Sequence, residues 1–297
     1  MAELTRRDLL KAGGATAAIV GVAAFRGPAA AAKPPPPGAW NHDPRSPIGP
    51  LHWADIGFPA CVTGTGTAGQ SPVNIATSSL AAYHGPPLVL RYEPSELGVE
   101  NTGHVVEVMT PAGVTSTALI GGQSYPLVQY HFHAPAEHAV NGRLADVEGH
   151  FVHTNAQGVT AVIGVFFRIG HEPNPVLDKI LLSAPVTAGD ETNAGEASPA
   201  ELFRHIRGVS CTRGPVLVNS FYAYSGSLTT PGCTEGVVWS VLADGGGVSK
   251  AAVTRFHRVI ARFPYYYGYP NNNRPVLPLN GRVIQLRRGK KDDQTTS

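Results

Sequence analysis

The chain has 297 residues, of which 42% are hydrophobic and 15% charged, and its formal net charge is +2 at pH 7. This composition is enough for one large hydrophobic core, and it lacks the basic excess with which proteins neutralise nucleic-acid phosphates. We therefore expect a single globular domain with no nucleic-acid partner.

The chain begins with a predicted export signal. Paired arginines precede an uncharged run from Ala12 to Phe25, which is 14 residues long, and an alanine-rich stretch follows. Because a membrane-spanning helix needs roughly 20 apolar residues, we favour a twin-arginine signal peptide over residues 1–32 rather than a membrane anchor. Residues 1–32 hold four of the 23 lysines and arginines and two of the 21 aspartates and glutamates. Removal of the signal peptide would therefore leave 19 basic and 19 acidic side chains, a net charge of about zero. We expect an exported protein, periplasmic or extracellular, with no stable membrane span after cleavage.

Composition also suggests the remaining boundaries. Residues 33–39 are a proline-rich, extended spacer, residues 40–288 are the globular domain, and residues 289–297 are a disordered, solvated tail. The sequence predicts no particular oligomeric state.

Turn-forming residues are spread through the domain. The 34 glycines and 26 prolines separate short apolar runs, a pattern typical of many strands joined by turns. Amphipathic helices are few, with candidates at 173–184, 198–206 and 249–263. We therefore predict a mainly β domain with a few short peripheral helices.

Five of the twelve histidines lie within residues 128–153. On a β-strand, side chains two residues apart share a face, so His131 and His133 point the same way and the phenylalanine between them points to the other side. Glu148 and His150 are related in the same manner. An Asn-Gly turn signal lies between the two segments. We expect two strands that bring His150 opposite the first two histidines.

Three converging imidazoles with one vacant position are typical of a catalytic zinc site, whereas structural zinc sites are usually closed by four ligands. The alternative is a set of hydrogen-bonded interior histidines, which is the usual state of a single buried histidine. The His-x-His pattern with a third histidine favours the metal. Gln129 and Glu148 each stand two residues before a candidate ligand, where they can accept a hydrogen bond from its other ring nitrogen.

These segments, together with others in the same order, resemble the α-class carbonic anhydrases. The similarity extends from about Trp40 to about Gln285 and includes GPLHW (49–53), GQSPVNI (69–75), NTGHVVEV (101–108), HFHAPAEH (131–138), EGHFVH (148–153), AVIGVFFRIG (161–170), YSGSLTTPGCTEGVVW (224–239) and NNRPVLPLNGR (272–282). It implies one domain built on a large, mostly antiparallel, twisted central sheet of about ten strands. It also implies a carbonic anhydrase, a zinc lyase with ligands His131, His133 and His150.

The implied reaction is the reversible hydration of carbon dioxide to bicarbonate and a proton by zinc-hydroxide attack. Zinc lowers the pKa of its bound water to about 7, a value for which this family is itself the reference case. By resemblance, Thr229 orients the hydroxide and donates its own proton to Glu137, and Thr230 contacts the bicarbonate. His104 is the implied proton shuttle, since a histidine ordinarily titrates near neutral pH.

The resemblance implies two further groups of residues. An apolar wall for carbon dioxide is expected from Val152, Val162, Leu228 and Trp239. His138 and Tyr224 are expected to form a hydrogen-bonded network with Glu148 behind the ligands.

The three cysteines allow three different single bridges, and an exported protein can form one. The residues alone leave the choice open, but the resemblance to secreted family members implies Cys61–Cys233. Cys211 is then expected to be a buried free thiol.

Two positions depart from the family's pattern. Ala136 stands where serine is common, and Glu107 stands where a small polar residue is common, so its charge would slightly raise the pKa of the zinc-bound water. Two alternative functions remain, a zinc hydrolase acting on activated esters and a non-catalytic binding module of the same fold. The second is expected to have lost a ligand histidine, and all three are present.

Overall fold

The computed structural model describes residues 36, 38–64, 69–211 and 214–289. The predicted signal peptide, most of the predicted spacer and residues 290–297 of the predicted tail lie outside these residues.

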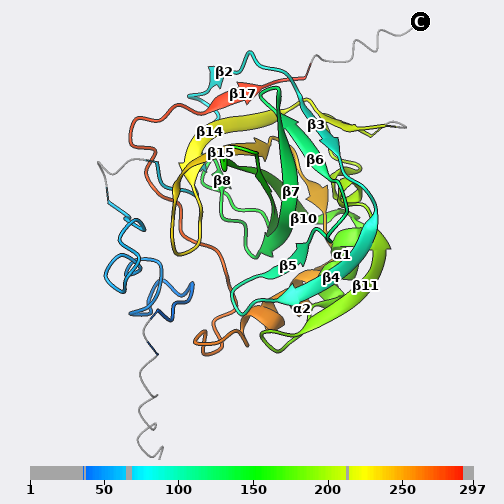
Figure 1. Cartoon of the computed structure of the whole chain (residues 1–297). Helices are drawn as coiled ribbons and strands as arrows, with labels where there is room; N and C mark the ends of the chain where they lie inside the picture. The colour runs from blue at the N-terminus through cyan, green and yellow to red at the C-terminus, as the bar shows by residue number, and fades with distance from the viewer. Residues whose placement is uncertain (1–35, 37, 65–68, 212–213, 290–297) are drawn as a thin grey trace, which may run out of the picture. The chain divides into compact units, whose positions relative to one another are not determined.

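One large, curled sheet of 15 strands is the main element of the described chain (Figure 1). Eleven of its strands lie on one path, in the order β12 (Val209–Cys211), β13 (Val216–Val218), β3 (Leu88–Arg91), β6 (Thr117–Ile120), β7 (Gln123–His133), β9 (Val147–Thr154), β10 (Thr160–Pro173), β15 (Glu235–Leu242), β14 (Phe221–Ser227), β17 (Gln285–Arg287) and β2 (Ala81–Ala82). The strands off this path are β5 (Val106–Met109) beside β7, β4 (Ser95–Asn101) beside β5, β11 (Glu191–Ala197) beside β4, and β16 (Gly246–Gly247) beside β10. A separate pair is formed by β1 (Asn74–Ile75) and β8 (Ala139–Val140).

Within the large sheet, the pairs β10–β15, β10–β16 and β17–β2 are parallel and the others are antiparallel. The sheet is therefore mixed but mostly antiparallel, and the predicted mainly β, single-domain fold is confirmed.

Two α-helices occur in the described residues, α1 (Pro175–Ser183) and α2 (Lys250–Ile260). Each begins after a residue whose side chain accepts hydrogen bonds from the first turn, Asn174 for α1 and Ser249 for α2. The helices pack against each other, and α1 also contacts β11 and β4 (Figure 1). The two longer predicted helices are thus confirmed with narrower bounds.

The third predicted helix, at 198–206, is wrong as an α-helix. The chain forms only a 3₁₀-helix there, Pro199–Phe203, which opens with a capping box between Ser198 and Glu201. His205 has a φ of +62°, outside the right-handed helical region, so the helix cannot continue through it.

The two faces of the sheet bury different side chains. One face carries the larger apolar core, in which Phe132 and Phe151 are fully buried and on which both helices pack. The other face carries a smaller apolar cluster that includes Val162 and Trp239. The strand alternation predicted for β7 is therefore present, with Phe132 on the core side.

β7 and β9 are antiparallel neighbours, with His131 opposite His150. The predicted turn is also present, since Asn141 and Gly142 have φ values of 51° and 75°, as a tight turn of this kind requires. It lies after β8, between that short strand and β9.

The disulfide joins Cys61 to Cys233 and is buried beside Trp53. It ties the segment before β1 to the loop between β14 and β15. Cys211 is free, as expected, but it is exposed rather than buried, because β12 is the last strand on its side of the sheet path.

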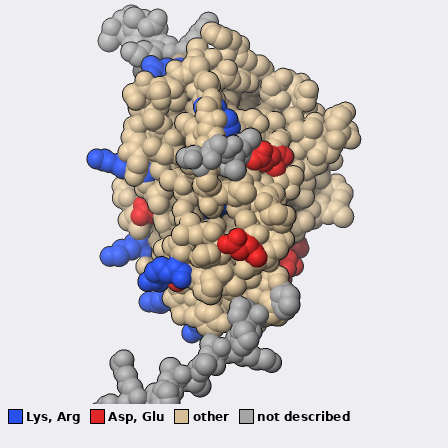
Figure 2. Space-filling model, turned by 90° about the vertical axis from the view of Figure 1, so that its left-hand side faces the viewer, with Lys and Arg blue, Asp and Glu red and all other residues tan. Residues whose placement is uncertain are grey.

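Neither α-helix of the described residues has the length and hydropathy that a membrane crossing requires. On the face drawn in Figure 2, lysines, arginines, aspartates and glutamates are scattered over a largely uncharged surface.

Removing the disulfide in a Cys61→Ser, Cys233→Ser double variant should lower the free energy of unfolding by about 2–5 kcal/mol, because the bond closes a long loop in the unfolded chain. Its two residues are 172 positions apart. Urea denaturation measures the change. The control is Cys211→Ser, an exposed site where a shift within about 0.5 kcal/mol is expected. Equal urea midpoints for the double variant and the parent would contradict the prediction.

Candidate metal centre

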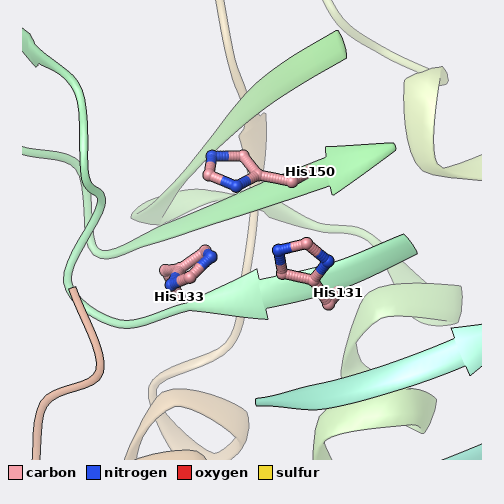
Figure 3. A group of neighbouring side chains, drawn as sticks. All are labelled: His131, His133 and His150. Atoms are coloured by element: carbon pink, nitrogen blue, oxygen red, sulfur yellow. The ribbon is translucent and has the colours of Figure 1, made fainter. Parts of the chain in front are cut away.

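Three histidine side chains from neighbouring strands point into one space (Figure 3). His131 and His133 come from the end of β7 and His150 comes from β9. One nitrogen of each ring lies within 4.8 Å of a nitrogen of the other two rings. The three predicted ligands are therefore together.

The opposite nitrogen of each ring is held by an oxygen acceptor. The pairs are His131 Nδ1 with Gln129 Oε1 at 2.9 Å, His133 Nδ1 with the Asn272 carbonyl oxygen at 2.7 Å, and His150 Nε2 with Glu148 Oε1 at 3.0 Å. Because carbonyl and carboxylate oxygens only accept, these outer nitrogens carry the ring protons. The inner nitrogens then present lone pairs, and His133 Nε2 is buried with no hydrogen-bond partner among the described residues.

This donor set fits a zinc ion. Three neutral imidazoles without cysteine are the ligands of zinc sites that keep a position open, and each ligand has the acceptor that such sites place behind it. Burial, together with the neighbouring imidazoles, lowers the pKa of His131 well below its ordinary value. For His150, burial lowers the pKa, but the Glu148 carboxylate outweighs burial and raises the pKa overall.

Glu148 is the centre of the predicted network behind the ligands. Its Oε2 accepts hydrogen bonds from the backbone N–H groups of Glu137 and His138, and its Oε1 accepts from His138 Nδ1 at 2.7 Å. His138 Nε2 then accepts from the Tyr224 hydroxyl at 2.6 Å. Burial raises the pKa of Glu148, but His138 and His150 outweigh burial and hold it well below its ordinary value. The carboxylate therefore stays ionised inside the protein.

Thr229 and Thr230 lie in the loop between β14 and β15, next to the disulfide. Thr229 is buried and Thr230 half-buried. No hydrogen bond joins Thr229 to Glu137 in the part of the chain that the structure describes. Glu137 Oε1 accepts from the Arg274 backbone N–H at 2.7 Å, whereas the buried Oε2 has no hydrogen-bond partner there and lies 3.9 Å from His150 Nδ1.

The four predicted wall residues, Val152, Val162, Leu228 and Trp239, belong to one apolar cluster. The Trp239 ring centroid lies 4.9 Å from that of His150. The cluster therefore borders the histidine centre.

His104 stacks on Trp40, with ring centroids 3.7 Å apart and planes 7° from parallel. Burial lowers its pKa to about 4, and its Nδ1 has no hydrogen-bond partner among the described residues. The expectation of an ordinary histidine pKa near neutrality is therefore not met at this position, because the ring is largely withdrawn from water.

Asn272 is the main residue that the sequence analysis missed. Besides holding His133 through its carbonyl, it accepts from the Ala134 backbone N–H and donates to the carbonyls of Phe132 and His104. Asn272 belongs to the NNRPVLPLNGR segment, whose similarity to the family was recognised, but the sequence alone indicated no role for this residue.

Two other buried residues were also missed. Arg274, in the same segment, holds Glu137 through its backbone, and its guanidinium donates to Gln70 Oε1 and the Ser71 carbonyl. His42 hydrogen-bonds Tyr266 through Nδ1, and its ring centroid lies 6.3 Å from that of His133. No pattern in the sequence distinguishes His42 from the exposed histidines.

Comparisons with known proteins agree with this geometry. The family model described as "Eukaryotic-type carbonic anhydrase" matches residues 48–288. "Alpha carbonic anhydrase 4" of Arabidopsis thaliana is 33% identical over 245 residues, which cover 82% of this chain and 84% of that protein. A carbonic anhydrase of Pectobacterium atrosepticum is 34% identical over 244 residues, with coverage of 79% and 86%. The solved α-carbonic anhydrase of Thermovibrio ammonificans, in complex with the inhibitor sulfanilamide, has a TM-score of 0.69 at 32% identity, covering 83% of this chain and 98% of that one.

Proposed function

Because the chain belongs to the eukaryotic-type, or α-class, carbonic anhydrase family and is a carbonic anhydrase, we propose that it hydrates carbon dioxide with a zinc ion held by His131, His133 and His150. The observation that carries the proposal is the set of three inner ring nitrogens, each with its opposite nitrogen fixed by an acceptor. When bound, zinc would act as a Lewis acid and lower the pKa of a water molecule, so that hydroxide is available near neutral pH.

The apolar cluster would receive carbon dioxide. A small, uncharged substrate gains nothing from hydrogen-bond donors, and a dry surface beside the reacting atoms excludes competing water. Val162 and Trp239 are almost fully buried, while Val152 and Leu228 are partly exposed, so the wall has an accessible side. We assign the four to substrate binding on this ground.

Thr229 and Glu137 would orient the attacking oxygen. Glu137 is fully buried, one of its oxygens is engaged by Arg274, and the other has no hydrogen-bond partner among the described residues. A hydroxyl that donates to this oxygen can use its own lone pair only to accept from the attacking oxygen, which fixes the direction of attack. Thr229 is the hydroxyl that we assign, and Thr230 would contact the bicarbonate.

His104 would transfer the released proton to buffer. Its Nδ1 has no hydrogen-bond partner in the described part of the chain, and the ring is held by stacking on Trp40 but is not fully buried. With a pKa of about 4, the stacked ring cannot hold a proton at neutral pH, so we infer that the ring turns away from Trp40 during transfer.

Export is also part of the proposal. The Cys61–Cys233 bond is consistent with an oxidising compartment, as are the bacterial and plant relatives. We infer that residues 1–32 direct export by the twin-arginine route and that residues 40–288 act as the mature domain.

Replacing a ligand tests the centre directly. His131→Ala leaves two imidazoles, so the dialysed variant should retain almost no zinc and hydrate no carbon dioxide. Elemental analysis and a stopped-flow hydration assay measure both quantities on one sample. His84→Ala, at an exposed site, is the control and should match the parent. Full hydration activity in a zinc-depleted sample would refute the assignment.

The hydroxyl assignment predicts a separation of metal binding from rate. Thr229→Ala should keep its zinc but lose about 100-fold in kcat/KM, since a misdirected attacking group costs about that much. Thr229→Ser restores a hydroxyl and should recover most of the rate. The role would be excluded if the alanine variant kept the parent's kinetics.

The proton-transfer assignment predicts dependence on buffer. His104→Ala should lower kcat mainly in dilute buffer, and added imidazole should restore it, because an external base then replaces the side chain. Hydration rates across a series of buffer concentrations measure this, with His84→Ala as the matched control. A loss of rate that no buffer concentration changes would argue against His104.

A further inference from the structure

A cavity outside the histidine centre is lined in part by β10, the strand next to β9, which carries His150. This cavity of about 450 Å³ is lined by Phe166 and Arg168 of β10, by His205 and Arg207 of the segment after the 3₁₀-helix, and by Asp244 of the turn after β15. On β10, Gly164 is the residue opposite His150, and alternate residues beyond it lead to Arg168. The cavity has the volume of an ordinary small-molecule site and no part in the chemistry proposed above.

The polar lining of this cavity is mostly basic. Four of its side chains can carry positive charge, and they are Arg168, His171, His205 and Arg207. The single carboxylate in the lining, Asp244, is already engaged by Arg207 through contacts of 3.1 Å and 2.6 Å.

Arg168 is the less engaged of the two arginines. Its guanidinium makes one long hydrogen bond, 3.4 Å to the Leu144 carbonyl, and no ion pair among the described residues. The side chains of His171 and His205 make no hydrogen bonds in that same part of the chain. A planar guanidinium with several free N–H groups matches the oxygens of a phosphate or carboxylate.

The backbone around the cavity is held in unusual conformations. His205 has a φ of +62°, which few residues other than glycine adopt. A Cβ at Gly245 would lie 2.5 Å from the Phe166 carbonyl oxygen, so only glycine allows the turn that carries Asp244 to approach β10 this closely. His205 and Asp244, which come from separate segments, both line the cavity at these two unusual backbone positions.

We propose that this cavity binds a small anion with two or more negatively charged oxygens, held chiefly by the Arg168 guanidinium. Such an anion matches the charge of the lining, which holds two guanidinium groups and one carboxylate. The site is separate from the histidine centre and does not depend on the proposed reaction.

Isothermal titration of the full protein with inorganic phosphate and with succinate, at constant ionic strength in chloride, tests the proposal. At least one probe should bind, and Arg168→Gln should weaken that binding about tenfold or more, as loss of a charge-assisted contact does. Asp244→Asn should tighten it several-fold, because the only competing carboxylate is removed. Arg91→Gln, at an exposed arginine on another strand, is the control and should bind as the parent does.

Binding of phosphate alone identifies a phosphate site, and binding of succinate alone identifies a polycarboxylate site. Persistence of binding in His131→Ala separates the cavity from the histidine centre. The proposal is overturned if neither probe binds, or if Arg168→Gln and Asp244→Asn both keep the parent's affinity.

Discussion

The antiparallel register between β7 and β9 is the constraint on which the rest of the site depends. It places His131 opposite His150, and strand alternation places His133 on the same face. A slip of one residue in β7 would turn both of its histidines into the apolar core and bring Phe132 to the site. Phe132 is fully buried on the opposite face, so the core that stabilises the sheet also fixes the orientation of the three histidines of the candidate metal centre.

Burial at this centre is tolerated because each charge has a partner. A buried carboxylate without partners would take up a proton, but Glu148 accepts from two backbone N–H groups and two imidazoles. Glu137 differs, since Arg274 engages one oxygen and the other has no hydrogen-bond partner in the described chain. The fully satisfied carboxylate, Glu148, holds the proposed ligand His150, while the partly satisfied Glu137 keeps one oxygen available for the role that we propose for it.

Much of this arrangement could be predicted from the sequence because it depends on local alternation. The shared face of His131 and His133 and the acceptors Gln129 and Glu148 follow from spacings of two residues, and the Asn-Gly turn signal indicated that the two histidine strands pair. Contacts between distant segments could not be predicted in this way. Asn272 reaches His133 across 139 positions, the stacking of His104 on Trp40 joins residues 64 positions apart, and the exposure of Cys211 depends on which strand ends the sheet. The pKa of His104 is lowered by burial under distant parts of the chain, so no residue pattern could reveal it.

Asn272 has a consequence for how this enzyme can change. One amide side chain donates to the carbonyls of His104 and of Phe132 on β7, while the backbone carbonyl of the same residue accepts from His133. A displacement of this segment would therefore move His104, the proposed proton-transfer residue, and His133, a proposed ligand, together. A substitution of Asn272 would therefore alter the surroundings of both histidines at once, and neither could be adjusted through this residue without the other.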